Sequence, residues 1–301
     1  MKRAVIFAHW DNNLTIDDYV VYYLKELKKV IEKVIFVSAN NLSENETKKL
    51  DGIADNIIAK HHNEYDFGSY KRGFEILKAE GLSNYEEIIF ANDSCYAPLF
   101  SLDKLFEEME EKECDFWGIT KNNYGLKGKN PHIQTYFIAF RKNVFMDNDF
   151  IKFISSVKPE LDKNSVIENY EIGLSKILFQ NGYKAETFVK EFENISNPTI
   201  KKWKSLITKS KSPFLKCSVL RLKNTDYTTA DGWHEVIGKT NYPIELIENN
   251  LKRTQEKLNT EPKLPTGIKE FLYNSLNYLP QKLRVPFINL VKKVFSSTSS
   301  K

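Results

Sequence analysis

The sequence is poor in cysteine and has no long apolar run. Its three cysteines, Cys95, Cys114 and Cys217, stand at no C-x-x-C or other metal-ligand spacing, which argues against a disulfide framework and a structural zinc site. No stretch approaches the roughly 20 apolar residues that a membrane-spanning helix needs. The first apolar run stops at His9 and is too short for a signal peptide. We therefore expect a cytoplasmic protein.

Acidic side chains are scarce in the last third of the chain. Residues 1–199 carry 25 Lys and Arg against 32 Asp and Glu, whereas residues 200–301 carry 19 against 8. Over the 301 residues, 41% are apolar, which is enough for one large α/β domain with a sizeable core. The change in charge predicts an α/β domain over 1–198 and a basic, partly helical extension over 199–301.

Apolar strands alternate with amphipathic helices in the first part of the chain. Residues 3–8 and 33–38 are mostly apolar, as in strands buried on both faces, and an amphipathic helix separates them. Such a β-α-β unit predicts a parallel, Rossmann-like sheet. Further strands are expected at 56–59, 87–91, 115–119, 133–140 and 183–189, with helices at about 68–79 and 102–112.

Two capping boxes mark expected helix starts. Thr15 with Asp18 precedes the first helix, and Ser165 with Glu168 precedes a later helix whose apolar stripe contains Glu171. A carboxylate in an apolar stripe must be paired, reach solvent through a cleft, or shift its pKa. We expect a raised pKa at Glu171, which suits a general base.

A dense polar cluster over residues 61–73 leads directly into a helix. Backbone N–H groups at the helix start, together with Lys71 and Arg72, are suited to hold an anion. The residue types also fit a second interpretation, in which Asp66 caps the helix and the histidines lie on the surface. The cluster alone does not choose between the two.

The apolar run at 87–91 ends in Asn92, Asp93 and Ser94. Ligands of open α/β sheets bind beyond the carboxyl ends of the strands, so Asp93 is a candidate ligand for a cation that bridges a diphosphate. An Asx turn after a strand explains the same carboxylate. Further polar candidates for this site are His132, Gln134 and His234.

Five separated motifs carry a family resemblance. They are EYDFGSYKRGFE from Glu64, IIFANDSCYAPLFSLDKLFEEM from Ile88, CDFWGIT from Cys114, HIQTYFIAFRK from His132 and YEIGLSKILFQNGY from Tyr170. In this order and spacing they resemble the rhamnan synthesis protein F family, rhamnosyltransferase-like proteins of lipopolysaccharide and cell-wall polysaccharide assembly. The resemblance covers about residues 3–220. It implies a GT-A-like mixed sheet flanked by helices.

The resemblance also implies an activity and a site. It implies an inverting glycosyltransferase with a nucleotide-sugar donor, commonly of the dTDP-rhamnose type. Glu171 would be the general base, with Asp66 the next candidate, and Asp93 would bind Mg²⁺ or Mn²⁺ although the Asp-x-Asp metal motif is reduced to one carboxylate. Without a metal, Lys71, Arg72 or Arg141 would supply the positive charge. The expected donor-binding residues are His9, Ser38, Asn40, Tyr65, Gly68, Lys71, Asn92, Asp93 and Ser94.

The basic extension interleaves lysines with aromatic and aliphatic residues at 200–216 and again from 267. Such segments suit an anionic membrane surface, so we expect a peripheral protein at the inner face of the cell membrane, near a lipid-linked glycan acceptor. A non-catalytic module that binds a nucleotide or polysaccharide fits the same fold. We expect no nucleic-acid partner, because the acidic first two thirds would repel a phosphate backbone.

Overall fold

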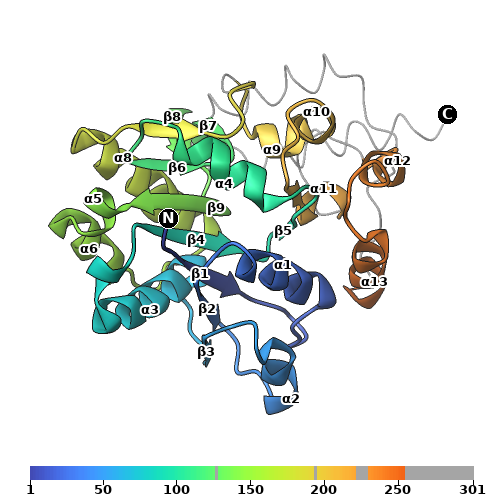
Figure 1. Ribbon diagram of the computed structural model, residues 1–301, viewed down its shortest axis with the longest axis horizontal. Coiled ribbons are helices and arrows are strands. Elements are labelled where there is room, and N and C mark those ends of the chain that lie inside the picture. Colours follow the sequence, from blue (N-terminus) through green and yellow to red (C-terminus); the bar gives the residue numbers. More distant parts are fainter. Residues whose placement is uncertain (126–127, 193–194, 222–229, 255–301) are drawn as a thin grey trace.

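A mixed sheet of seven strands runs through the middle of the molecule in the computed structural model (Figure 1). The structure describes residues 1–125, 128–192, 195–221 and 230–254. The strand order is β10-β6-β9-β4-β1-β2-β3. These strands are β1 (Arg3–His9), β2 (Lys33–Ser38), β3 (Asn56–Ala59), β4 (Glu87–Asn92), β6 (Phe116–Gly118), β9 (Phe137–Arg141) and β10 (Ala185–Thr187).

Strand β9 runs against its neighbours. It pairs antiparallel with β4 and β6, whereas the other neighbouring pairs in this sheet are parallel. The carboxyl ends of β1, β2 and β4 therefore meet at one edge, and the residues just before β9 reach the same edge. The predicted α/β class, with a mixed sheet flanked by helices, is confirmed.

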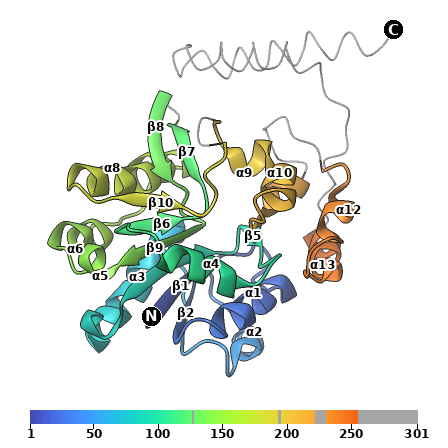
Figure 2. The same ribbon diagram turned by 45° about the horizontal axis from the view of Figure 1, so that its top comes forward.

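Helices cover both faces of the sheet (Figures 1 and 2). Successive side chains of β1 point to opposite faces, so Val5 and Phe7 join one apolar cluster and Ala4 and Ile6 join another. The longer helices are α1 (Asp18–Lys28), α3 (Tyr65–Glu80), α4 (Leu102–Glu110), α6 (Asn148–Ser155), α8 (Gly173–Gln180) and α13 (Ile244–Thr254). The shorter ones are α2 (Glu44–Thr47), α5 (Lys142–Phe145), α7 (Lys163–Val166), α9 (Pro198–Lys201), α10 (Trp203–Thr208), α11 (Cys217–Leu220) and α12 (Trp233–Ile237).

Two small two-stranded sheets lie beside the main one. β5 (Cys95–Tyr96) pairs antiparallel with β11 (Leu215–Lys216), and β7 (Lys121–Gly125) pairs antiparallel with β8 (Gly128–Ile133). The β5–β11 pair brings a segment from the expected extension next to the end of β4. Lys216 lies opposite Cys95 in this pair.

The hydrophobic core continues across the expected boundary at residue 198. Trp203, Leu206 and Phe214 are buried in the same cluster as Phe7 of β1. The apolar side chains of 200–216 are therefore core residues. The expectation that they face a membrane is wrong, because they are buried inside the protein. The apolar and basic tail from 267 lies outside the described residues.

No helix in the described part of the chain is both long enough and apolar enough to cross a membrane.

The first expected capping box is wrong. Asp17 is the N-cap residue of α1, and the Thr15 hydroxyl donates to the Asn13 carbonyl instead. The Asp17 carboxylate caps no helix N–H, because it accepts bonds from Asn250 and Arg253 of α13. A contact between distant segments has replaced the local one.

The second expected capping box is also wrong. Asp162 caps α7, and its carboxylate accepts from the Ser165 N–H at 2.8 Å. After α7 the chain makes one π-helical turn over Ile167–Ile172 and then enters α8. Such turns are frequent at functional sites, and this one carries Glu171.

One expected strand is two. The strand expected at 133–140 is interrupted: β8 ends at Ile133 and β9 starts at Phe137. Between them the Gln134 N–H donates to the Thr120 carbonyl and the chain turns. The other expected strands are present, although β6 and β10 are shorter than expected. Helix α3 begins at Tyr65, earlier than the expected start at 68.

Candidate active site

The ends of three parallel strands bring the first candidate residues together. His9 ends β1, Ser38 ends β2 and Asn92 ends β4. In the pairing register His9 lies beside Ser38, and Asn92 lies beside Ala8. The donor-binding residues expected from these three strands therefore share one edge of the sheet.

His9, Ser38 and Asn40 form one bonded group. The His9 Nδ1 and Ser38 Oγ atoms are 2.9 Å apart, and Asn40 Oδ1 accepts from the Asp11 N–H at 2.9 Å. Burial lowers the pKa of His9 to about 4, so this ring is neutral at neutral pH. The group fixes the loop that follows β1, and it offers no cation to a diphosphate.

Asn92 links two parts of the site. Its Nδ2 donates to Asp66 Oδ2 at 2.9 Å, and its Oδ1 accepts from the Ser94 N–H and the Ser94 hydroxyl. Asp66 comes from the first turn of α3, next to the exposed Tyr65. Burial raises the pKa of the Asp66 carboxyl. Asp66 therefore belongs to the strand-end site and is not an N-cap of α3.

Asp93 is the least stabilised carboxylate of the site. Its Oδ2 accepts from the Trp10 N–H at 2.8 Å, and its carbonyl accepts from the Tyr19 hydroxyl at 2.8 Å. Burial raises the pKa of Asp93 to about 7, and the Asp66 charge acts in the same direction. Asp93 thus changes its charge close to neutral pH.

Glu171 reaches the same edge from the π-helical turn. Its Oε2 accepts from the Thr135 hydroxyl at 2.7 Å, and its Oε1 lies 3.3 Å from His132 Nε2. His132 Nδ1 lies 2.7 Å from the Asn130 carbonyl, so both ring nitrogens face acceptors. This geometry favours a doubly protonated imidazole.

The expected raised pKa of Glu171 is wrong. Burial opposes ionisation, but the hydrogen bonds from His132 and Thr135 outweigh it and lower the pKa of Glu171. The same pair raises the pKa of His132 against the effect of burial. The polar partners of Glu171 come from the segment before β9, so the sequence of the helix does not reveal them.

Lys216 joins this cluster, and sequence reasoning did not single it out. Its Nζ donates to Ser94 Oγ at 2.8 Å and lies 4.6 Å from the centre of the Tyr136 ring. Its charge lowers the pKa of both Asp66 and Glu171 against the effect of burial. No local signal marks Lys216, because it is one of six lysines in 200–216.

The other expected basic residues have different partners. Lys71 Nζ donates to the Val157 carbonyl, and Arg72 pairs with Glu64. Arg141 pairs with the buried Glu87 at the opposite edge of the sheet. None of these three contacts Asp66, Asp93 or Glu171 within the described residues. The residues that flank them in the sequence do not reveal these partners.

Gly68 has a packing role that its sequence motif does not reveal. Its N–H donates to the Glu64 carbonyl, so this N–H is not available to a phosphate. A Cβ atom at Gly68 would lie 2.9 Å from His62 Nδ1 and still closer to Glu64 Cβ. The glycine therefore permits the close approach of His62 to α3.

Two further polar candidates are held elsewhere. Gln134 Oε1 accepts from the hydroxyls of Thr120 and Thr199 in a buried network. His234 lies exposed on α12 and pairs with Glu248. Of the three polar candidates, His132 reaches the site through Glu171.

The residues of the Asn92-Asp93-Ser94 motif do not fit a divalent cation. Asn92 is bonded to Asp66 and Ser94, and Ser94 Oγ already receives the Lys216 ammonium. A cation on Asp93 and Ser94 would meet that ammonium, which repels it. Across the described ranges, no group of three or more His, Cys, Asp or Glu side chains is arranged to hold a metal ion.

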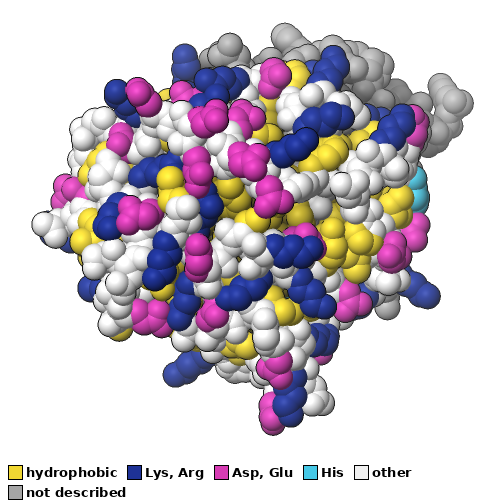
Figure 3. Space-filling view, viewed as in Figure 1, with side chains coloured by type: hydrophobic (Ala, Val, Ile, Leu, Met, Phe, Trp, Pro, Cys, Tyr) yellow, Lys and Arg dark blue, Asp and Glu magenta, His cyan; other side chains and the backbone are white. Residues whose placement is uncertain are grey.

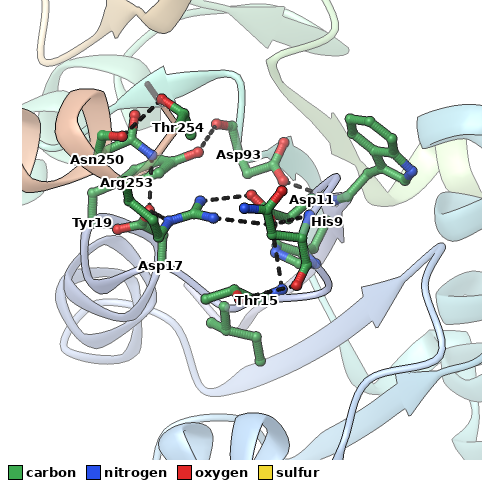
Figure 4. A network of polar contacts seen from close by, with 12 residues as sticks. His9, Asp11, Thr15, Asp17, Tyr19, Asp93, Asn250, Arg253 and Thr254 are labelled. Atoms are coloured by element: carbon green, nitrogen blue, oxygen red, sulfur yellow. Dashed lines mark hydrogen bonds and ion pairs between the residues drawn. The ribbon is translucent and has the colours of Figure 1, made fainter. Parts of the chain in front are cut away.

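A polar network ties the loop after β1 to the end of α13 (Figure 4). Arg253 donates to Asp11 Oδ2 and to Asp17 Oδ2, each at 2.6 Å. Asn250 donates to the same Asp17 oxygen at 2.8 Å and accepts from the Tyr96 hydroxyl. The loop that carries the Trp10 N–H to Asp93 is thus held from the far end of the described chain.

A cavity of about 550 Å³ lies away from these residues. Its lining comes from the amino-terminal edge of the sheet and comprises Met1, Glu86, Glu110, Arg141, Lys142 and Asn143. It contains none of the strand-end carboxylates. We assign the candidate active site to the carboxyl edge, where the charged groups of several elements converge.

The comparison with protein families decides the relationship of this chain. The family described as rhamnan synthesis protein F matches residues 34–288. The chain belongs to the rhamnan synthesis protein F family. This confirms the resemblance of the five motifs and supports a glycosyltransferase-like function.

An uncharacterized protein, y4gN, of Sinorhizobium fredii is 30% identical over 168 residues, which is 54% of this chain and 44% of the relative. The chain thus spans less than half the length of that relative.

Solved structures similar to this family member come from nucleotide-dependent transferases. A cytidylyltransferase from Leptospira borgpetersenii aligns with a TM-score of 0.41 and 12% identity, over 88% of this chain and all of that one. Core-mannan synthase A from Aspergillus fumigatus, in a Mn/GDP form, aligns with a TM-score of 0.34 and 10% identity, over 58% of this chain and 70% of that one.

Proposed function

We propose that this chain is an inverting glycosyltransferase that moves a hexose, with rhamnose the first candidate, from a nucleotide donor to a surface polysaccharide acceptor. Membership of the rhamnan synthesis protein F family supports the reaction class. The donor is a nucleotide sugar, with dTDP-rhamnose the first to test. Lipopolysaccharide or cell-wall glycan is the acceptor class.

One observation carries the proposal. Asp66 and Glu171 come from separate elements, yet the charge of Lys216 at the carboxyl edge acts on both, and its Nζ donates to Ser94, the residue after Asp93. Buried and half-buried charges destabilise a fold unless they are paired, so their convergence favours a functional role. Ligands of such sheets bind at this edge.

Glu171 is the proposed general base. Its lowered pKa keeps it ionised at neutral pH, and Thr135 and His132 fix its orientation. The acceptor oxygen forms a bond to the anomeric carbon while the bond from that carbon to the diphosphate oxygen breaks. The electron pair stays on the diphosphate, and the acceptor proton passes to Glu171. A weakly basic carboxylate receives this proton late, when the acceptor oxygen has become more acidic.

Asp66 is the second candidate base. Its raised pKa makes it the stronger base when ionised, and its bond to Asn92 places it beside the end of β4. His9, Ser38 and Asn40 are proposed to shape the nucleotide side of the site, together with the exposed Trp10, which follows His9, and the exposed Tyr65, which precedes Asp66. With the nucleotide on that side, Glu171 is proposed to face the hydroxyl group of the acceptor.

The acceptor is proposed to be a lipid-linked glycan at the inner face of the cell membrane. The support is the excess of basic residues in 200–301, since anionic lipids attract clustered Lys and Arg. On the face seen in Figure 3 the acidic and basic side chains are interspersed, so this face gives no support to a membrane contact.

A panel of nucleotide sugars tests the function directly. Thermal shift is expected to show stabilisation by one donor, because a ligand that binds only the folded state stabilises it. The purified protein should then hydrolyse that donor slowly and transfer its sugar to an acceptor glycan. Binding without hydrolysis or transfer would favour a non-catalytic module. Failure to bind any donor would contradict both the transferase and the non-catalytic nucleotide-sugar-binding module.

A further inference from the structure

The ammonium of Lys216 lies at the carboxyl edge of the sheet, beside the carboxylates of the candidate site. It contacts the Ser94 hydroxyl and the Tyr136 ring, and within the described residues it forms no ion pair with a carboxylate. Yet it lies close enough to Asp66 and Glu171 to act on both. A half-buried cation with two neutral contacts is well suited to receive an anion.

The fold fixes this ammonium at the sheet edge. Strand β11 pairs with β5, which places Lys216 opposite Cys95, the residue after Ser94. Leu215 and Cys217 on either side are buried in the apolar cluster. Side chains alternate along a strand, so Lys216 is turned away from that cluster and toward the end of β4.

Lys216 also contacts the residue at which an Asp-x-Asp motif would carry its second carboxylate. In this chain that position is Ser94, and its hydroxyl is bonded to Asn92 and to Lys216. A divalent cation would have one carboxylate, Asp93, and would face a positive charge. A diphosphate would instead find an ammonium donor already oriented.

We propose that the Lys216 ammonium, rather than a divalent cation, binds the donor diphosphate and neutralises it as the bond to the sugar breaks. This rests on the proposed function. As the glycosidic oxygen leaves with its electron pair, the added negative charge develops on the phosphate beside Lys216. The side chain therefore stabilises the leaving group and takes no proton in the step.

Calorimetry with dTDP, UDP and GDP, each compared with its nucleoside and measured in EDTA, tests the proposal. Wild-type protein is expected to bind one diphosphate equally well with and without EDTA. Lys216→Met should bind that diphosphate about tenfold to a hundredfold more weakly, the usual effect of losing a charge-assisted hydrogen bond, while its affinity for the nucleoside is unchanged. Lys216→Arg keeps the charge and should lose less.

Lys209→Met is the matched control, because Lys209 is exposed in the same lysine-rich segment. It should bind the diphosphate like the wild type. Wild-type affinity for Lys216→Met, or loss of wild-type binding in EDTA, would overturn the proposal and leave the transferase function standing. Failure of the wild type to bind any of the nucleotides would instead overturn the proposed function. The EDTA comparison uses wild-type protein alone, so it decides even where Lys216→Met does not fold.

Discussion

Three carboxylates at one sheet edge differ because their immediate partners differ. Asp93 has one backbone N–H on its carboxylate and its pKa is raised by burial, whereas Glu171 has a hydroxyl and an imidazole and its pKa is lowered. Residue type and spacing made Asp93 and Glu171 candidates, and Asp66 became a candidate base with the family resemblance. Their charges depend on hydrogen bonds from the Thr135 hydroxyl, the His132 ring and the Trp10 N–H. The sequence does not show that these groups lie beside the carboxylates.

The Glu171→Gln variant should separate chemistry from binding. Gln keeps the size and accepts the Thr135 bond but cannot take a proton, so transfer should fall by about 10²–10⁴-fold. Donor affinity should change little. Steady-state kinetics and calorimetry on the same preparations check this. Asp66→Asn is the comparison, and if it loses transfer while Glu171→Gln keeps it, Asp66 is the base.

The Asp93→Asn variant should be more stable than the wild type above neutral pH. The folded-state pKa of about 7 lies above the ordinary aspartate pKa of 3.8, so the folded protein binds this proton more tightly than the unfolded chain. That stabilisation is present at low pH and is lost as pH rises from about 4 through about 7. Asn does not ionise, so the variant does not lose stability in this way as pH rises. Thermal unfolding should show that its Tm exceeds the wild-type Tm by an amount that grows from pH 5 to pH 8.

Asp55→Asn is a control of opposite sign. Bonds from Lys28 and Val34 lower the pKa of Asp55 despite burial, so its stabilisation is present at neutral pH and is lost as pH falls. Its Tm deficit should shrink in acid. A Tm difference for Asp93→Asn that stays constant with pH would mean that Asp93 does not titrate near neutrality.

At the scale of elements, apolar periodicity predicted the main strands and most long helices. β1, β2 and β4 fall within a residue or two of their expected bounds, because their buried apolar runs are continuous, and the half-buried β3 lies where it was expected. The errors lie at element ends. Asp17 and Asp162 replaced the expected caps, and the run 133–140 contains a turn held by bonds to Thr120 and Asn92.

The contact of α13 with the loop after β1 is the element-scale feature that periodicity could not reveal. Figure 2 shows α13 beside α1, and Arg253 bridges Asp11 and Asp17 across this contact. The three side chains are at most 25% exposed. Removing the guanidinium would leave two carboxylates without their partner.

We predict that Arg253→Gln lowers the free energy of unfolding by about 1–3 kcal/mol, less than for a fully buried pair because Arg253 is partly exposed. Urea unfolding measures this. Lys252→Gln is the matched control, since Lys252 is exposed on the same helix turn, and it should change stability little. Equal effects of the two variants would contradict a specific bridge.

For the whole molecule, the opposite charges of the two regions remain the basis of a membrane prediction. Residues 255–301 carry eight Lys and Arg against three Asp and Glu. Full-length protein should float with anionic liposomes more than a variant ending at Thr254, and high salt should remove the difference. Neutral liposomes are the control. Equal flotation of both proteins would contradict a role of this segment.

The bridge from Arg253 to Asp11 also bears on the order in which the molecule becomes functional. The two residues are 242 positions apart in the chain. Contacts of such separation form late in folding, because a long loop must close first. During synthesis the sheet edge is made early, but its diphosphate-facing Lys216 and the bridging Arg253 are translated later. A ribosome-bound chain that stops before Lys216 would carry the strands without a working site, which ties the onset of donor binding to the synthesis of the segment from β11 to α13.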